Sequence, residues 1–411
     1  MPETMPLPQN QPIAKQEAPK KPTRLAEVVG EEDFIPNDEI TEAEFMSPEE
    51  AAALGQNGLL NEQFDDISDV HDKFSPEMLQ KEEVVEAVTF KPFNGVELGI
   101  TLEKKRGRQE KGELNQDSVL LFEDPEIGEG VGVFDGLGKT KGDASGALAS
   151  AKATEVLPQH LREAFHGMNV AQISEQFSKL SFAAYDAKNQ KAISATAETY
   201  AGIDPEVMKR AVAIAEAFQR VNDDVKETGG ETTACFTLKY TTKDGKHFSI
   251  TVNVGDSGAI LRKKNGEVSL ITKPDKPIPQ LIEMGRLTPE LLQQMREKPT
   301  EVVAFGKSYE ALTRLTTQSL GTKIKPVFTI MELEAGDEVH NVSDGVLDFN
   351  VDENDELDLQ LIKAALNAES YPERINRLRE HSGLRSKIKA SEDNDFKDTD
   401  DISDAAIRIA A

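Results

Sequence analysis

The stretch that decides the fold is GVGVFDGLGKTKGDASGALAS, residues Gly130 to Ser150. It places one carboxylate, Asp135, at the end of an apolar, strand-like run and surrounds it with glycines. Glycines between a strand and a helix can cradle the pyrophosphate of a dinucleotide at the helix N-terminus. Alternatively, Asp135 itself is the functional residue, and the glycines let a ligand reach its carboxylate and the backbone carbonyl beside it. The rest of the chain distinguishes between these two interpretations.

The composition excludes several classes of function. The chain has 411 residues, and its 47 basic and 74 acidic residues give a net charge of -27, which argues against binding to nucleic acid phosphates. It contains no run of about 18 apolar residues that would indicate a membrane span, and its N-terminus does not have the pattern of a secretory signal. With one cysteine, Cys235, and six histidines, neither an internal disulfide nor a thiolate zinc site is expected. We therefore expect a cytoplasmic protein in which any metal ion is held by oxygen ligands.

The acidity is concentrated at the N-terminus. Residues 1–87 contain 21 acidic and 6 basic residues, a net charge near -15. This segment is rich in proline at its start and poor in β-branched and aromatic residues, so we expect it to be mostly disordered. Two helix starts, at Ser47 and Ser75, combine a serine cap with proline at the first helical position. They form transient helices in a solvated tail, or short recognition helices for a protein partner.

The pattern changes near Val88 to that of a folded domain, which we expect to extend over residues 88–411. Strand-like segments come in runs linked by Asp-Gly and Asn-Gly turns, helices come in blocks, and the clearest helix begins after a cap at Asp204. Residues 167–203 have the composition of a helical insertion, and residues 275–323 that of a Pro-rich, partly helical flap. The whole indicates an α+β fold with antiparallel sheets and counts against the alternating units of a dinucleotide-binding domain.

The glycine spacing also counts against the dinucleotide interpretation. That interpretation requires GxGxxG and an acid about 20 residues further on, at the end of a second parallel strand. Here GVGVFDGLG spaces the glycines differently, and a predicted helix fills the region where the second strand would lie. Asp135 is therefore the better candidate for the functional residue of this stretch.

Aspartates recur at predicted strand ends further along the chain. A carboxylate at a strand end is held by the sheet but points off it, and several that converge make an anionic site for hard divalent cations. An aspartate before glycine is also a common turn residue, so no single one is decisive. The candidates are Asp117 in NQDS, Asp135 in VFDG, Asp256 in VGDSG, Asp344 and Asp348 in VSDGVLD, and Asp400 and Asp401 in DTDDIS.

In this order the set resembles the metal-dependent serine/threonine protein phosphatases, the type 2C or PPM family. The resemblance implies two antiparallel sheets packed face to face with helices outside, a four-layer αββα sandwich, and a two-metal cleft at one edge of it. The matching segments span residues 115–404 and are NQDS, VGVFDGLG with GDASGALAS, GGETTACF, VNVGDSGAILRKKNGEVSLIT, MGRLTPELLQQM, LTTQSLG, LEAGDEVHNVSDGVLDF and DDIS.

The resemblance also implies roles for individual residues. Asp135 would bridge two Mn²⁺ or Mg²⁺ ions, and the carbonyl of Gly136 would bind the second of them. Asp344 and Asp400 match the other ligands of the first ion. Asp117 matches an acid that reaches the metals through coordinated water, so Asp135 and Asp117 are the candidate catalytic residues.

Further matches concern the surroundings of the two metals. Asp256 and Asp348 match acids that the family uses around a third, weaker metal ion, although Asp256 could stabilise a turn instead. Thr232 and Thr233 begin a core strand and are expected to be structural. Because water activated by metals replaces a protein nucleophile, Cys235 is expected to be a buried core residue.

The chain departs from the family at the residue that clamps the substrate phosphate. The family has an arginine about five residues before the aspartate of NQD, where this chain has Gly112. Lys111, or Arg108 from the preceding basic cluster, could bind the phosphate instead, although a solvated strand end explains the cluster equally well. Lys139 stands where family members often have glycine, and it either contacts phosphate or points to water.

The leading hypothesis is an enzyme that hydrolyses phosphoserine or phosphothreonine in proteins. Two divalent cations about 4 Å apart lower the pKa of a shared water and offset charge on the phosphoryl oxygens. The alternative is a catalytically weak or inactive phosphatase-fold module that regulates a partner protein. It is motivated by the missing arginine and by the final segment DDISDAAIRIA, which has Asp404 and three alanines where β-branched residues are usual. In that segment Asp401 could also replace Asp400 as the ligand.

We predict that residues 1–87 are a tether outside the catalytic machinery. Their negative charge opposes docking in a cleft lined with acids, and their helix starts are too short to fold alone. A truncated protein that begins at Val84 should keep its fold, its Mn²⁺ affinity and its turnover of an aryl phosphate. Limited proteolysis of the full chain should cut within residues 1–80 first. Unfolding of the truncated protein, or a several-fold change in its turnover, would contradict the prediction.

Overall fold

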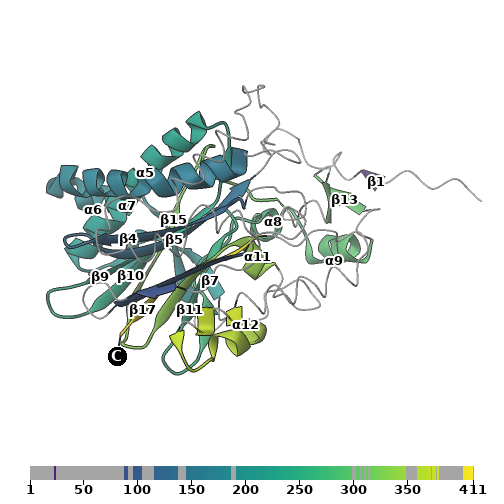
Figure 1. Cartoon of the computed structure of the whole chain (residues 1–411). Helices are drawn as coiled ribbons and strands as arrows, with labels where there is room; N and C mark the ends of the chain where they lie inside the picture. Colours follow the sequence, from purple (N-terminus) through teal and green to yellow (C-terminus); the bar gives the residue numbers. More distant parts are fainter. Residues whose placement is uncertain are drawn as a thin grey trace, which may run out of the picture. The chain divides into compact units, whose positions relative to one another are not determined.

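The computed structural model (Figure 1) describes most of the chain after residue 115 and three short segments before it. By its contacts the chain divides into a small unit, residues 1–40 and 277–315, and a large unit with the remainder, which contains all candidate metal residues. The described residues are 23–24, 88–90, 96–103, 115–137, 145–186, 191–298, 315–348 and 401–410, with parts of 302–312 and 359–378.

The first sheet of the large unit contains the strand that ends in Asp135. Its order is β4-β5-β9-β10-β15-β6-β7, and β8 pairs with the end of β5. Neighbouring strands are antiparallel, as expected, except that β15 and β6 run parallel. The strands are β4 (Asp117–Asp124), β5 (Gly128–Leu137), β6 (Ser181–Asp186), β7 (Lys191–Ala195), β8 (Glu231–Thr232), β9 (Ala234–Thr241), β10 (His247–Val254) and β15 (Val327–Leu333).

The second sheet has the order β12-β11-β16-β17-β3-β2, and all its pairs are antiparallel. The closing segment of the chain forms β17, which pairs with β3 along its whole length and with β16 on the other side. The final segment is therefore a regular inner strand. The strands are β2 (Val88–Phe90), β3 (Val96–Glu103), β11 (Gly258–Arg262), β12 (Val268–Leu270), β16 (Glu338–Val342) and β17 (Ile402–Ile409).

Helices cover the outer face of the first sheet. Figure 1 shows α5 (Ser145–Gly167) and α7 (Pro205–Glu227) packed together over it. The Asp204 side chain caps α7 as predicted, and accepts the N–H of Glu206 at 2.7 Å. Buried Phe134 of β5 and buried Phe218 of α7 belong to the same apolar core in this layer. None of the helices in the described part of the chain combines the length and the apolar run that a bilayer crossing requires.

The inner faces of the two sheets form a second core. Alternate β5 side chains point to opposite faces, so Val133 enters this core while Phe134 enters the helical layer. Cys235 of β9 lies fully buried here, which confirms its expected role, and burial raises the pKa of its thiol. Beyond the second sheet, α11 (Asp344–Leu347) and α12 (Leu359–Leu366) complete a four-layer αββα arrangement.

The segment 167–203 is only partly helical, which corrects the expected helical insertion. It contains α6 (Ile173–Ser178) and two short 3-10 helices, but also the antiparallel hairpin of β6 and β7 at the edge of the first sheet. Phe182 of β6 packs against Phe177, Tyr200 and Phe328, with ring centroids 4.9, 5.0 and 6.4 Å apart. This aromatic packing fixes a strand where alanine-rich sequence favours helix.

The small unit has its own apolar core, which includes Leu287 and Met295. It contains α8 (Pro277–Glu283) and α9 (Pro289–Glu297), and its strand β13 (Val302–Ala304) pairs with β14 (Lys307–Ser308) and with β1 (Thr23–Arg24). Residues 277–315 of this unit lie within the range 275–323 for which a flap is predicted, and the role of a flap stays a prediction. Within the tail, residues 23–24 are the described part, and the helix starts at residues 47 and 75 lie outside the described residues.

A histidine is buried among opposite charges in the second sheet. The ring nitrogens of His340 lie 3.1 Å from Asp404 Oδ2 and 3.5 Å from Glu338 Oε2. Burial alone would lower the pKa of His340, but the charges and hydrogen bonds of Asp404 and Glu338 outweigh it and raise the pKa to about 9. Asp404, which departs from the family pattern, therefore serves as the partner of a buried imidazolium.

We predict that this ion pair makes stability depend on pH. The folded-state pKa lies above the ordinary value of 6.5, so the stabilisation is complete below about pH 6.5 and is lost as pH rises through about 9. In urea unfolding between about pH 6 and pH 10, this pair should contribute a loss on the order of 3 kcal/mol, and His340→Gln should remove that part of the pH dependence. His166→Gln, whose side chain is 55% exposed on α5, should keep the wild-type profile. A flat wild-type profile would be inconsistent with this prediction.

Candidate metal centre

Two predicted site residues face each other across β4 and β5. Asp117 is the Cα partner of Asp135, and the N–H of Gly136 donates to the carbonyl of Gln116 at 3.0 Å. Directly opposed residues in an antiparallel pair point to the same side of the sheet. The strand register therefore places both carboxylates on one side at one end of the first sheet.

Two threonines fix the main chain of Asp135. Thr233 Oγ1 accepts the N–H of Asp135 at 3.2 Å, and the carbonyl of Asp135 accepts the N–H of Thr233 at 2.8 Å and the hydroxyl of Thr232 at 2.9 Å. Thr233 also shares a 2.6 Å hydrogen bond with Ser257, beside Asp256. Both threonines are fully buried, and these contacts make them positioning residues for the aspartate.

The glycine after Asp135 allows a close approach of three chain segments. A Cβ atom at Gly136 would lie 2.2 Å from the carbonyl oxygen of Gly146 in α5 and 2.6 Å from that of Gln116. Backbone atoms occupy that space, so no side chain fits without displacing α5 or β4. Glycine at this position thus allows α5 to pack directly against the end of β5, where Asp135 lies.

The start of β17 is bonded to the start of β4. Asp401 Oδ2 accepts the N–H of Gln116 at 3.0 Å, and Ser403 donates its hydroxyl to Asp117 Oδ2 at 2.6 Å. Asp401 is 2% exposed and Asp117 is 5% exposed. These two hydrogen bonds join the second sheet to the first at the end where Asp117 and Asp135 lie.

The first turn of α11 adds the next predicted ligand. Ser343, before Asp344, accepts the N–H of Ser403 on its hydroxyl at 3.0 Å and donates its own N–H to the Ser403 carbonyl at 3.2 Å. A Cβ at Gly345 would lie 2.1 Å from the carbonyl oxygen of Asp401. Asp344 therefore stands directly beside the start of β17.

Four chain segments thus bring acids to one end of the sandwich: β4, β5, α11 and the start of β17. Their donors are carboxylate and carbonyl oxygens, which suit Mg²⁺ and Mn²⁺. Within the described ranges, no three His, Cys, Asp or Glu side chains lie close enough together to hold a metal ion. Asp400, Lys111, Arg108, Gly112 and Lys139 lie outside the described residues.

Asp256 and Asp348 are brought together by a residue that the sequence analysis missed. Lys276 Nζ lies 2.9 Å from Asp256 Oδ2 and 3.1 Å from Asp348 Oδ2. Burial alone would lower the pKa of Lys276, but the charges of Asp256, Asp348 and Asp344 outweigh it and raise the pKa. No spacing rule links these three positions, so only the folded chain shows the contact.

Asp275 was also missed, and it joins two loops near this cluster. It exchanges main-chain and side-chain bonds with Gly255: Asp275 N–H to the Gly255 carbonyl at 2.8 Å, and Gly255 N–H to Asp275 Oδ2 at 2.9 Å. The Asp275 carbonyl accepts the N–H of Thr317 at 2.8 Å, and Gln318 donates to Oδ2 at 2.6 Å. Burial raises the pKa of Asp275 to about 7. Asp275 thereby fixes the main chain next to Lys276.

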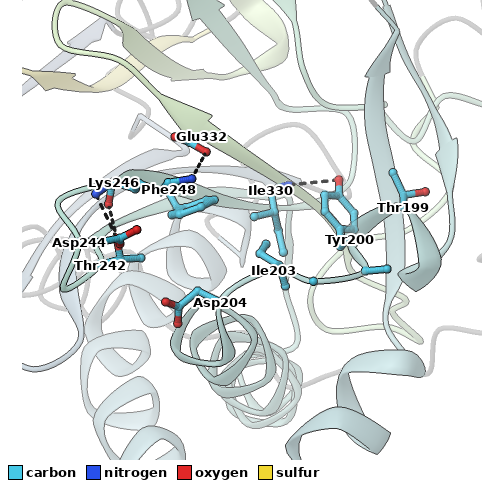
Figure 2. A pocket seen from close by; sticks show the side chains of 12 residues that line it. Thr199, Tyr200, Ile203, Asp204, Thr242, Asp244, Lys246, Phe248, Ile330 and Glu332 are labelled. Atoms are coloured by element: carbon cyan, nitrogen blue, oxygen red, sulfur yellow. Dashed lines mark hydrogen bonds and ion pairs between the residues drawn. The ribbon is translucent and has the colours of Figure 1, made fainter.

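A surface hollow of about 470 Å³ lies elsewhere and contains none of the candidate metal residues. Figure 2 shows it between the loop at residues 199–204, the turn at residues 242–246, and Phe248 and Ile330. Lys246 at its rim is ion-paired with Glu332 at 3.3 Å. The hollow therefore does not contribute to the metal centre.

The chain belongs to the protein phosphatase 2C family, whose model matches residues 106–380. Among solved structures, the Mycobacterium tuberculosis serine/threonine phosphatase PstP/Ppp is 20% identical, with a TM-score of 0.47 over 77% of this chain and 99% of that one. The PstP catalytic domain in complex with two manganese ions is 20% identical, with a TM-score of 0.44 over the same shares. The S. agalactiae serine/threonine phosphatase is 18% identical, with a TM-score of 0.43 over 80% and 99%. No curated protein matches the chain.

The close packing at Gly136 leads to a stability prediction. Gly136→Ala should lower the free energy of unfolding by on the order of 2 kcal/mol or more, because backbone atoms must move to admit the methyl group. Gly167→Ala is the control, since a Cβ there would meet no atom within 4 Å, and its effect should stay within about 0.5 kcal/mol. Urea denaturation measures both. Equal effects of the two substitutions would refute the packing argument.

Proposed function

We propose that this member of the protein phosphatase 2C family is a metal-dependent enzyme that hydrolyses phosphoserine and phosphothreonine monoesters in proteins. The observation that supports the proposal is that the segments with three of the predicted acids are bonded to one another at one end of the sandwich. Asp117 pairs with Asp135 across β4 and β5, and Ser403 of β17 bonds both to Asp117 and to Ser343, the residue before Asp344. Hydrogen bonds to Thr233, Ser403 and Ser343 hold these segments together.

The proposed ligands of two Mn²⁺ or Mg²⁺ ions are Asp135, the carbonyl of Gly136, Asp344 and Asp400. The carboxylate of Asp401 already accepts the N–H of Gln116, which supports its neighbour Asp400 as the ligand. Bound cations of this kind lower the pKa of water and offset negative charge on a phosphoryl group.

The chain's own residues would position the reacting groups. Asp117 is nearly buried, and the Ser403 hydroxyl fixes one of its oxygens at 2.6 Å, so it is suited to orient a water and accept its proton. Thr232 and Thr233 keep the Asp135 main chain in place. Lys111 and Arg108 remain the proposed phosphate-binding residues in the absence of the family's arginine.

The second candidate is a weakly active or inactive module that regulates a partner protein. The glycine at position 112, where the family has arginine, favours it. The final segment no longer does, because β17 is paired on both sides and Asp404 has a partner in His340. The acidic tail remains a candidate binding segment for a protein partner under either proposal.

We predict that hydrolysis of an aryl phosphate requires added Mn²⁺ or Mg²⁺ and stops with EDTA. Asp135→Asn and Asp344→Asn should each reduce turnover by about 100-fold or more, because each removes a proposed metal ligand. Asp204→Asn is the matched control: asparagine caps a helix as well as aspartate does, so turnover should be unchanged.

Calorimetry with Mn²⁺ separates the two candidates. Two-site binding accompanied by turnover would exclude the inactive module. A folded protein that binds no Mn²⁺ and leaves aryl phosphate and phosphopeptides intact would overturn the proposed enzyme.

A further inference from the structure

Lys276 occupies the place between the two acids that resemble ligands of a third metal ion. Asp256 follows β10, Asp348 directly follows α11, and the lysine follows β12, so the cluster joins three separate parts of the chain. The side chains of Asp256 and Lys276 are 4% and 17% exposed, and that of Asp348 is 43% exposed. The ammonium is therefore largely shielded and paired with an acid on either side.

The main chain holds the lysine there. The two hydrogen bonds between Asp275 and Gly255, at 2.8 and 2.9 Å, join the residue before Lys276 to the residue before Asp256. Further bonds from Thr317 and Gln318 fix Asp275 on its other side. The pairing of Lys276 with Asp256 thus follows from fixed backbone segments and is not the position of a freely rotating surface lysine.

A third divalent cation does not fit these residues as they stand. To reach Asp256 and Asp348 it would have to approach an ammonium that lies about 3 Å from both, against strong like-charge repulsion. Displacing the ammonium would leave a mostly buried cation without its partners, which a weak metal site cannot offset. Asp256 Oδ1 is buried and has no hydrogen-bond partner in the described structure. The lysine therefore leaves one oxygen of this acid available to coordinate a metal ion once the ammonium is removed.

We propose that Lys276 is a built-in cation that replaces the third, weaker metal ion, so that this chain binds two divalent cations and no third. The inference rests on the proposed two-metal function. It assigns Lys276 as a positioning residue that neutralises Asp256 and Asp348 next to Asp344.

The test is the number of Mn²⁺ ions bound by the full-length protein, measured by titration calorimetry and by electron paramagnetic resonance of free Mn²⁺. The wild type should bind two. Lys276→Met keeps the length of the side chain but removes its charge, and it should gain one weaker site. The double variant Lys276→Met with Asp256→Asn should lose that gained site.

Lys263→Met is the matched control. Lys263 Nζ lies 2.8 Å from the buried carboxylate of Asp337, but that acid accepts the N–H groups of Glu334 and Lys264 and has no second acid in its pair. Removing this lysine should therefore add no Mn²⁺ site. A gain in Lys263→Met equal to that in Lys276→Met would overturn the proposal.

Three sites in the wild type, or no added site in a folded Lys276→Met protein, would also overturn it. If thermal melting shows that Lys276→Met does not fold, Asp256→Asn decides: unchanged Mn²⁺ stoichiometry supports the proposal, and loss of a site refutes it. Failure of the proposed function would look different, because the wild type would bind no Mn²⁺. A site gained in Lys276→Met would still be detected from that baseline.

Discussion

The candidate site depends on the hydrogen bonds that cross between the two sheets at one end of the sandwich. Gln116 N–H donates to Asp401, and the Ser403 hydroxyl donates to Asp117, across 285 and 286 residues of sequence. Without them, the starts of β4 and β17 would be related only through the middle of the sandwich. There Asn341 of β16 donates to the Val131 carbonyl and accepts from Thr237, each at 2.8 Å, and the other contacts are largely apolar and non-directional. The bonds convert that packing into a fixed relation between acids from opposite sheets, as metal binding at defined positions requires.

Acids that converge repel one another, so each cluster in this acidic chain needs a compensating charge or bond. Buried or half-buried cations supply it at several places: half-buried Lys276 between Asp256 and Asp348, buried His340 between Asp404 and Glu338, and buried Lys239 at 3.4 Å from Glu129. Main-chain N–H groups supply it elsewhere, as at Asp401 and Asp275. For the acids of the proposed two-metal centre, bound divalent cations would supply the compensating positive charge.

The sequence was sufficient for features that follow from local pattern. Strand runs linked by turn residues predicted antiparallel sheets, and the family resemblance implied that two of them pack face to face. The strand-end positions of the aspartates indicated that acids from different strands converge, and Asp117 and Asp135 are indeed paired. The sequence was insufficient where contacts between distant residues override local preference. The packing of Phe182 against three aromatic rings stabilises a strand in an alanine-rich segment, and this strand, β6, pairs in parallel with β15. The pairing of Lys276 with Asp256 and Asp348 depends on how three loops are folded together, and no periodic pattern in the sequence predicts it.

A fixed ammonium and a weakly bound metal ion differ in how they respond to the surroundings. Occupancy of a weak metal site follows mass action and rises or falls with the free metal concentration. A lysine held by its own main chain supplies one positive charge at all metal concentrations, and with one charge instead of two it leaves Asp256 and Asp348 less strongly neutralised than a divalent ion would. If Lys276 fills the third site as proposed, the fold itself sets the charge next to Asp344. The free metal concentration would then change only the occupancy of the two proposed principal sites.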